Sequence, residues 1–171
     1  MSELVDLVNG NGEIVERAVL RDDSAVHEGL YLQIIIAVIR NGLGDILVHE
    51  RAGKKDVNPG DIDHVCGGIL SGETPESAAT REALEEVGIA PNNLEIVREG
   101  LNSYGRYCYL LRGQSDESPP ATLDANEVAW ANYVSVYELN AKKESGELTF
   151  VDGFFEDVTA TSVPSNGVSS L

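Results

Sequence analysis

Hydrophobic side chains occur in short runs separated by polar turns, a pattern that predicts a mixed fold of strands and helices. Residues 4–8 and 13–20 flank an Asn-Gly-Asn-Gly segment, whose positive φ angles suit a tight hairpin turn. The β-branched run 30–39 predicts a strand buried on both faces, paired with 46–51. Further strands are expected at 65–68, 94–101, 106–112 and 128–134.

Two segments have helical character. Thr74 is a good N-cap and Pro75 suits the first helical position, while Gly88 fits the left-handed position that ends a helix. We therefore predict a helix from Pro75 to Val87 and a second one at 136–143. Segment 150–158 is expected to pack back onto the core.

The first predicted helix carries a stripe of carboxylates. Glu82 and Glu86 lie one turn apart, with Glu85 beside them, so three like charges share one face. A divalent cation would relieve that repulsion, and an oxygen-rich, sulfur-free site suits Mg²⁺ or Mn²⁺. The opposite face is apolar and should face the sheet through Ala83, Leu84 and Val87.

Residues 67–89, GGILSGETPESAATREALEEVGI, resemble the signature of the Nudix family. That signature is Gly, five residues, Glu, seven residues, Arg-Glu, an aliphatic, any residue, Glu-Glu, any residue, Gly and an aliphatic. Ala83 departs from it, because a larger aliphatic is usual there, and the contact of this position with the sheet is expected to be thin. The positions in register are Gly67, Glu73, Arg81, Glu82, Glu85, Glu86, Gly88 and Ile89.

The resemblance implies an α/β fold: the Nudix-type α/β/α sandwich, with a mixed β-sheet and here an N-terminal β-hairpin. We expect a single domain over residues 1–158, made of a hairpin extension at 1–27 and a core at 28–145. Residues 159–171 are small and polar and are expected to form a disordered tail.

The resemblance also implies metal-dependent hydrolysis of a diphosphate bond in a nucleoside diphosphate linked to another moiety. It assigns the metal to Glu82, Glu85, Glu86 and the backbone carbonyl of Cys66, and it makes Glu85 or Glu86 the group that orients or deprotonates the attacking water. A further metal or base glutamate is expected at Glu127.

Three other positions of the signature are expected to act structurally. Glu73 lies near the metals and can pair with Arg81, which we interpret as a clamp for that carboxylate rather than a phosphate ligand. Gly67 lets the backbone approach the ion closely.

Two alternatives stay open. Segment 51–68 and its spacing to the signature resemble isopentenyl-diphosphate isomerase, in which a cysteine at the position of Cys66 is catalytic. However, Gly68 stands where that enzyme has a ligand histidine, and this chain keeps every signature glutamate. The second alternative is a module that binds a nucleotide without turning it over.

Charge and composition limit the partners. Hydrophobic residues make up 42% of the 171 residues, enough for a real core, and the net charge is −17. Such acidity argues against nucleic-acid polymers and anionic membranes, so we expect a small diphosphate substrate. No signal peptide or apolar span of sufficient length is seen, and only two cysteines occur, which predicts a cytoplasmic protein.

Substrate choice and oligomeric state carry no clear signature. Loops 52–63 and 114–126 are expected to select the substrate. The N-terminal hairpin has a sheet edge to which a second copy could add, so a homodimer is an open alternative.

Overall fold

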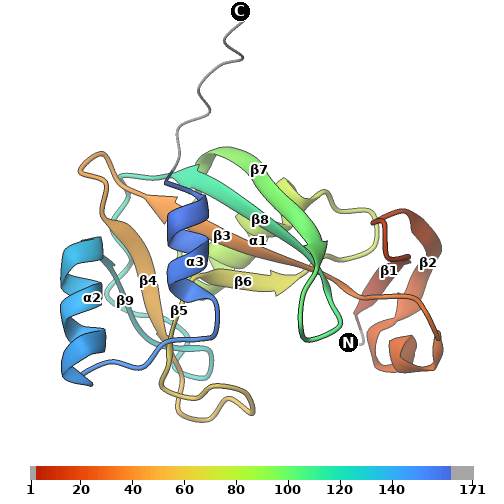
Figure 1. The fold of residues 1–171 in the computed structure, drawn as a ribbon, viewed down its shortest axis with the longest axis horizontal. Coiled ribbons are helices and arrows are strands. Elements are labelled where there is room, and N and C mark those ends of the chain that lie inside the picture. Colours follow the sequence, from red (N-terminus) through yellow and green to blue (C-terminus); the bar gives the residue numbers. More distant parts are fainter. Residues whose placement is uncertain (1–2, 163–171) are drawn as a thin grey trace, which may run out of the picture.

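The structure is a computed structural model that describes residues 3–162 (Figure 1). Its strands are β1 (Leu4–Val8), β2 (Ile14–Leu20), β3 (Gln33–Arg40), β4 (Ile46–Arg51), β5 (Ile62–Asp63), β6 (Val65–Gly68), β7 (Asn92–Leu101), β8 (Tyr107–Gln114) and β9 (Val128–Val134). Its helices are the 3-10 helix η1 (Arg21–Val26) and the α-helices α1 (Pro75–Val87), α2 (Val136–Ser145) and α3 (Phe154–Ala160).

Strand β3 lies at the centre of the main sheet. It pairs in parallel with β8, and β8 pairs in antiparallel with β7. On its other side β3 pairs with β6 along 34–37 and meets β4 only at the pair Arg40–Ile46. Strand β4 then continues between β5 and β9. The sheet is therefore mixed, as expected. The short strand β6 pairs with β3 along one edge, and its other edge faces α1.

The two faces of this sheet are covered by different helices. Helix α1 buries Ala79, Ala83 and Val87 against Ile35 and Ile39 of β3. On the opposite face, Phe154 and Val158 of α3 join a second cluster that includes Val38 and Leu110, and Leu139 of α2 belongs to the same cluster. Figure 1 shows α3 in front of the sheet and α1 behind it. These layers correspond to the predicted α/β/α sandwich.

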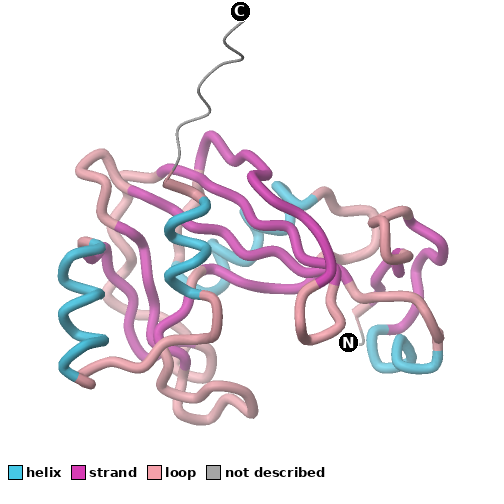
Figure 2. The backbone as a smooth tube through the Cα atoms, viewed as in Figure 1, coloured by secondary structure: helices cyan, strands magenta, loops and turns pink. Residues whose placement is uncertain are grey.

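The N-terminal hairpin stands apart at one end of the molecule (Figure 2). Strands β1 and β2 form their own antiparallel sheet, which is joined to the core by the bridge between Val8 and Tyr31. The buried Asp6 accepts hydrogen bonds from Ser71 (2.6 Å), in the loop before α1, and from the backbone of Ala18 (2.9 Å). The predicted hairpin is thus confirmed, and it is tied to the segment that leads into α1.

Several expectations need correction. Leu84 does not face the sheet, because 51% of it is exposed; the buried stripe of α1 passes through Ala79 and Ala83 instead. Ala83 itself is fully buried, so its contact with the core is not thin. Strand β3 is not buried on both faces throughout, since Ile34 and Ile36 are only partly buried and line a pocket.

The predicted start of the disordered tail, at residue 159, is too early in the chain. Helix α3 continues to Ala160, and the carbonyl oxygen of Thr161 accepts a hydrogen bond from Arg40 (3.3 Å). Phe154 and Val158 pack into the core and hold this helix in place. The helix therefore continues past residue 158, where the polar sequence predicted that the ordered chain ends. The rest of the predicted tail, 163–171, lies outside the described residues.

Candidate active site on α1 and β6

Local sequence determines where α1 begins and ends. The hydroxyl of Thr74 accepts from the backbone N–H of Ser77 (3.2 Å), and the Ser77 hydroxyl accepts from the N–H of Thr74 (2.9 Å), which forms a reciprocal cap. At the other end Gly88 has φ of 68°, the left-handed conformation that favours glycine. The bounds of this helix agree with the prediction.

Arg81 organises the carboxylates around it. Its guanidinium donates to both oxygens of Glu73, through Nε at 2.8 Å and Nη2 at 3.0 Å. Nη1 donates to Glu82 (2.8 Å) and to Glu85 (3.3 Å), and Nη2 also reaches the carbonyl oxygen of Gly68 (2.8 Å). These bonds lower the pKa of Glu73. The expected pairing of Arg81 with Glu73 is present and extends to two of the helix carboxylates, while the role of Arg81 as a clamp stays a prediction.

Gly67 makes room for Glu82. A Cβ atom at position 67 would lie 2.5 Å from Cγ of Glu82 and closer still to its carboxyl group. The glycine is therefore required by a side chain of α1 that packs directly on the backbone of β6. Burial raises the pKa of Glu82, although its bond to Arg81 opposes that effect.

Glu86 is half-buried and lies against the backbone of β6. Its Oε2 accepts a long hydrogen bond from the backbone N–H of Cys66 (3.3 Å). Burial, together with the nearby charges of Glu82 and Asp63, raises the pKa of Glu86 well above its usual value. A half-buried carboxylate with so little compensation is costly, and a bound cation would stabilise its charged form.

The free edge of β6 faces these carboxylates. The N–H of Ile69 donates to the carbonyl oxygen of Gln33 (3.1 Å), which sets the alternation of the β3–β6 ladder. By that alternation Cys66 and Gly68 are the residues whose N–H and C=O groups point away from β3. The N–H of Cys66 indeed binds Glu86, and the carbonyl of Gly68 binds Arg81. The same alternation directs the carbonyl of Cys66 toward α1, in agreement with its predicted role.

The donor set suits a hard divalent ion, because it consists of carboxylate and carbonyl oxygens. Among residues 3–162 no three His, Cys, Asp or Glu side chains are gathered closely enough to hold an ion as they stand. Glu82 and Glu85 are held by Arg81, and the Glu85 side chain is 61% exposed. The residues fit the ion by chemistry and by the unmet charge of Glu86, while Glu82 and Glu85 must turn from Arg81 to bind it.

Glu127 lies at the start of β9 and forms an ion pair with Lys55. The backbone joins the same two segments, since the N–H of Ala52 donates to the carbonyl of Glu127 (3.0 Å). Lys55 is also close enough to Glu86 to lower its pKa, against the effect of burial. Glu127 and the α1 carboxylates therefore share a cation as a neighbour, although no direct contact joins them.

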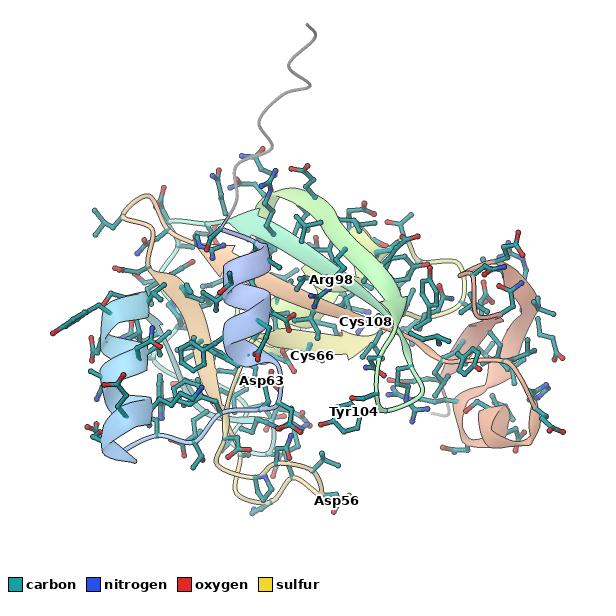
Figure 3. All side chains as sticks on the ribbon, in the orientation of Figure 1. Asp56, Asp63, Cys66, Arg98, Tyr104 and Cys108 are labelled. Atoms are coloured by element: carbon teal, nitrogen blue, oxygen red, sulfur yellow. The ribbon has the colours of Figure 1, made fainter. Side chains whose placement is uncertain are left out.

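A pocket of about 570 Å³ opens on the face of the sheet opposite α1. Its floor includes Ile34, Ile36 and Leu110, with the thiols Cys66 and Cys108 beside them. Figure 3 shows Arg98, Cys108, Cys66 and Asp63 in succession across this face, with Tyr104 below them on the β7–β8 loop. Cys66 therefore belongs to both regions: its side chain lines the pocket and its backbone N–H binds Glu86.

The pocket is built from segments that carry no motif. Of the two loops expected to select substrate, 52–63 contributes Val57, Asn58 and Asp63, whereas 114–126 contributes nothing to the lining. Residues 98–104 and 151–157 supply the other walls, and sequence reasoning missed both segments. The only sequence signal for the second was the expectation that 150–158 packs back onto the core.

The Cys66 thiol is suited to packing rather than to thiolate chemistry. Burial raises its pKa well above the usual value, and the nearby charges of Asp63 and Glu86 raise it further. His49 and His64 are also buried, and their Nδ1 atoms have no hydrogen-bond partner among the described residues.

Within the described part of the chain, no helix is long and apolar enough to cross a membrane.

Comparison with known proteins assigns the chain to a family. Residues 31–154 match the family model described as the NUDIX domain. A protein of Listeria monocytogenes called an uncharacterized Nudix hydrolase is 30% identical over 155 residues, which cover 88% of this chain and 89% of that protein. Another uncharacterized Nudix hydrolase, from Yersinia pestis, is 37% identical over 92 residues, and this match spans only 48% of its length.

Solved structures share this fold. The crystal structure of DR0079 from Deinococcus radiodurans superposes with a TM-score of 0.72 at 25% identity, covering 94% of this chain and 100% of that one. A NUDIX hydrolase from Nitrosomonas europaea has a TM-score of 0.59 at 20% identity over 76% of this chain and 87% of its own, which supports the fold. The chain therefore belongs to the Nudix family and is a hydrolase that acts on pyrophosphate bonds in phosphorus-containing anhydrides.

Proposed function

We propose that this protein hydrolyses the diphosphate bond of a nucleoside diphosphate linked to another moiety, with Mg²⁺ or Mn²⁺ as cofactor. One observation carries the proposal. The half-buried Glu86, with its raised pKa, meets the free backbone edge of β6 at Cys66, beside Glu82 and Glu85 of the same helix. This arrangement leaves negative charge that a divalent cation would satisfy.

The residues divide into two groups by role. Glu82, Glu85, Glu86 and the carbonyl of Cys66 would hold the ion, which when bound neutralises phosphate oxygens and makes a water molecule more acidic. Arg81 and Glu73 hold the helix carboxylates in position.

Glu85 or Glu86 orients the attacking water and accepts its proton. Glu85 is exposed and makes a single long bond to Arg81, so it can turn toward solvent with little loss. Glu127 would act as an additional ligand or base, which requires it to leave Lys55.

The test is a panel of nucleotide sugars, dinucleotides, nucleoside triphosphates and ADP-ribose, incubated with Mg²⁺ or Mn²⁺ and scored for release of phosphate or nucleoside monophosphate. Glu85→Gln and Glu86→Gln should each lower kcat by about 10² or more, as expected for loss of a catalytic base or metal ligand. Glu127→Gln should lower it by about tenfold or more if Glu127 serves as a ligand or base. Glu144→Gln, at an exposed position of α2, serves as the control.

Other outcomes would replace this proposal. Hydrolysis that persists in both Glu85→Gln and Glu86→Gln would contradict the mechanism. Binding of these compounds without turnover by the native protein would favour a binding module. Isomerisation of a prenyl diphosphate, lost in Cys66→Ala, would favour the isomerase reading. The names of the relatives and the raised pKa of the Cys66 thiol favour hydrolysis over both.

A further inference from the structure

Two links along the pocket wall join β7 and its following loop to α3 and the segment just before it. Arg98 of β7 donates to Asp157 of α3 (2.6 Å). The hydroxyl of Tyr104, in the β7–β8 loop, donates to Asp152, just before α3. The side chain of Asn102 supports that loop by accepting from the N–H groups of Tyr104 and Arg106 (both 3.0 Å). The loop therefore presents Tyr104 in a defined position.

The charges around this pocket do not balance. Arg51 is paired with Asp63 (2.9 Å), and Arg98 with Asp157 (2.6 Å), so each arginine is matched by one carboxylate. Asp152 also lines the pocket, but its hydrogen-bond partner, the hydroxyl of Tyr104, is neutral. Among residues 3–162 no ion pair gives Asp152 a cationic partner. Glu99 lines the same pocket and likewise has a neutral partner, the hydroxyl of Tyr107 (3.3 Å). The lining thus carries two carboxylates, Asp152 and Glu99, that no cation matches among the ion pairs of residues 3–162.

The floor offers nothing to offset those charges. It is made of aliphatic side chains and two thiols, and burial raises the pKa of Cys108 to about 11, which keeps that thiol neutral at physiological pH. An apolar wall strengthens the field of a nearby carboxylate relative to open water. The net charge of −17 on the whole chain acts in the same direction.

We propose that this pocket selects substrates by charge: it accepts an uncharged or cationic organic group of the diphosphate and disfavours one with a carboxylate or a further phosphate, with Asp152 and Glu99 as the specificity-determining residues. The proposal rests on the proposed function, since it assumes a diphosphate cleaved at α1. Two features connect the pocket to that site. Cys66 borders both, and a volume of about 570 Å³ lies in the usual range for small-molecule sites.

Two matched pairs of compounds test the proposal. UDP-glucose and UDP-glucuronate differ by a carboxylate at the sugar end, while ADP-ribose and its 2′-phosphate differ by a phosphate at the nucleoside end. Together they cover either orientation of the substrate. Binding is measured by calorimetry in the native protein with EDTA, so that metal-dependent turnover does not interfere, and kcat/KM is measured in the same protein with Mg²⁺.

We expect the uncharged member of at least one pair to bind about tenfold more tightly, as for like charges several ångströms apart in a partly screened cavity. Asp152→Asn together with Glu99→Gln should reduce that preference to about threefold or less, and each single variant should reduce it in part. Tyr104→Phe should preserve it, because the charge of Asp152 remains. The control is Glu144→Gln with Glu147→Gln, which removes two charges from the α2 region, away from the pocket lining.

Each outcome decides a different point. If neither pair discriminates, or if Asp152→Asn with Glu99→Gln changes the preference no more than the control does, charge selection is wrong while hydrolysis can still stand. If the preference appears in binding but the native protein hydrolyses none of the compounds, the proposed function fails and the selectivity stands. If none of the four compounds binds, both are contradicted.

Discussion

Glu82 of α1 packs on the backbone of Gly67 in β6 so closely that any side chain at position 67 would collide with its Cγ and carboxyl group. This contact joins the strand that precedes the signature to the helix that carries its glutamates. It also explains why a short strand with a glycine leads into a carboxylate-bearing helix.

Replacing Gly67 with Ala should displace the Glu82 carboxylate from Arg81 while the fold is retained, because the atoms it meets belong to a side chain that can turn. We expect metal affinity to fall by about 10- to 100-fold, the range for disturbed ligand support. Isothermal calorimetry with Mn²⁺ would measure this. Gly53→Ala is the matched control, because nothing lies within 4 Å of a Cβ there. Unchanged Mn²⁺ affinity would show that Glu82 is not a ligand.

Replacing Arg81 with Lys should lower the free energy of unfolding by about 2 kcal/mol, since one ammonium cannot reproduce the bonds that the guanidinium makes to Glu73, Glu82 and Gly68. Saturating Mg²⁺ should recover part of the loss, because ligand binding to the folded state stabilises it. Urea unfolding with EDTA and with Mg²⁺ gives both values.

Arg17→Lys provides the comparison for Arg81, because the Arg17 side chain is largely exposed and is recorded with one bond, to Asp6 (2.9 Å). Equal stabilities of the two variants in EDTA would mean that the clamp contributes little to folding.

The buried histidines should make the protein sensitive to mild acid. Burial lowers the pKa of His64 to about 4 and that of His49 to about 3. Below about pH 6.5 the unfolded chain binds protons at these residues and the folded chain does not, so the free energy of unfolding falls as the pH falls. Between pH 7 and pH 5 we expect about 1–2 kcal/mol from each residue.

Urea unfolding of His64→Gln at several pH values checks this expectation. The slope of stability against pH should become shallower than in the native protein, whatever the change in absolute stability. His27→Gln is the control, because His27 lies near the surface beside Glu16. An unchanged slope in His64→Gln would mean that His64 is protonated in the folded state.

The ion pair between Arg98 and Asp157 should contribute to docking of α3. The side chain of Asp157 is only 8% exposed, so Arg98→Ala leaves a buried carboxylate without its cation. We expect a loss of about 2 kcal/mol in the free energy of unfolding. The double variant with Asp157→Asn should lose less than the sum of the two single variants, because the unpaired charge is removed. Strict additivity in urea unfolding would contradict this coupling.

Much of the candidate site on α1 was predictable because it is local. Helical periodicity places Glu82, Glu85 and Glu86 on one face, and the Thr74 cap and Gly88 determine the ends of α1. The same short-range rules predicted the order of strands and helices. They erred at Leu84, because the choice of the buried face depends on how the helix lies on the sheet.

The tertiary structure alone decided the remainder. Segments around residues 51–58, 98–104 and 151–157 come together around the pocket, although they are far apart in the chain and share no motif. The register of β6 on β3 likewise decides that the backbone of Cys66 faces Glu86. Sequence by itself determined the carboxylate stripe, because side-chain direction in a helix follows from local geometry. Long-range strand pairing and burial determined the pocket, because those contacts depend on which segments meet across the sheet.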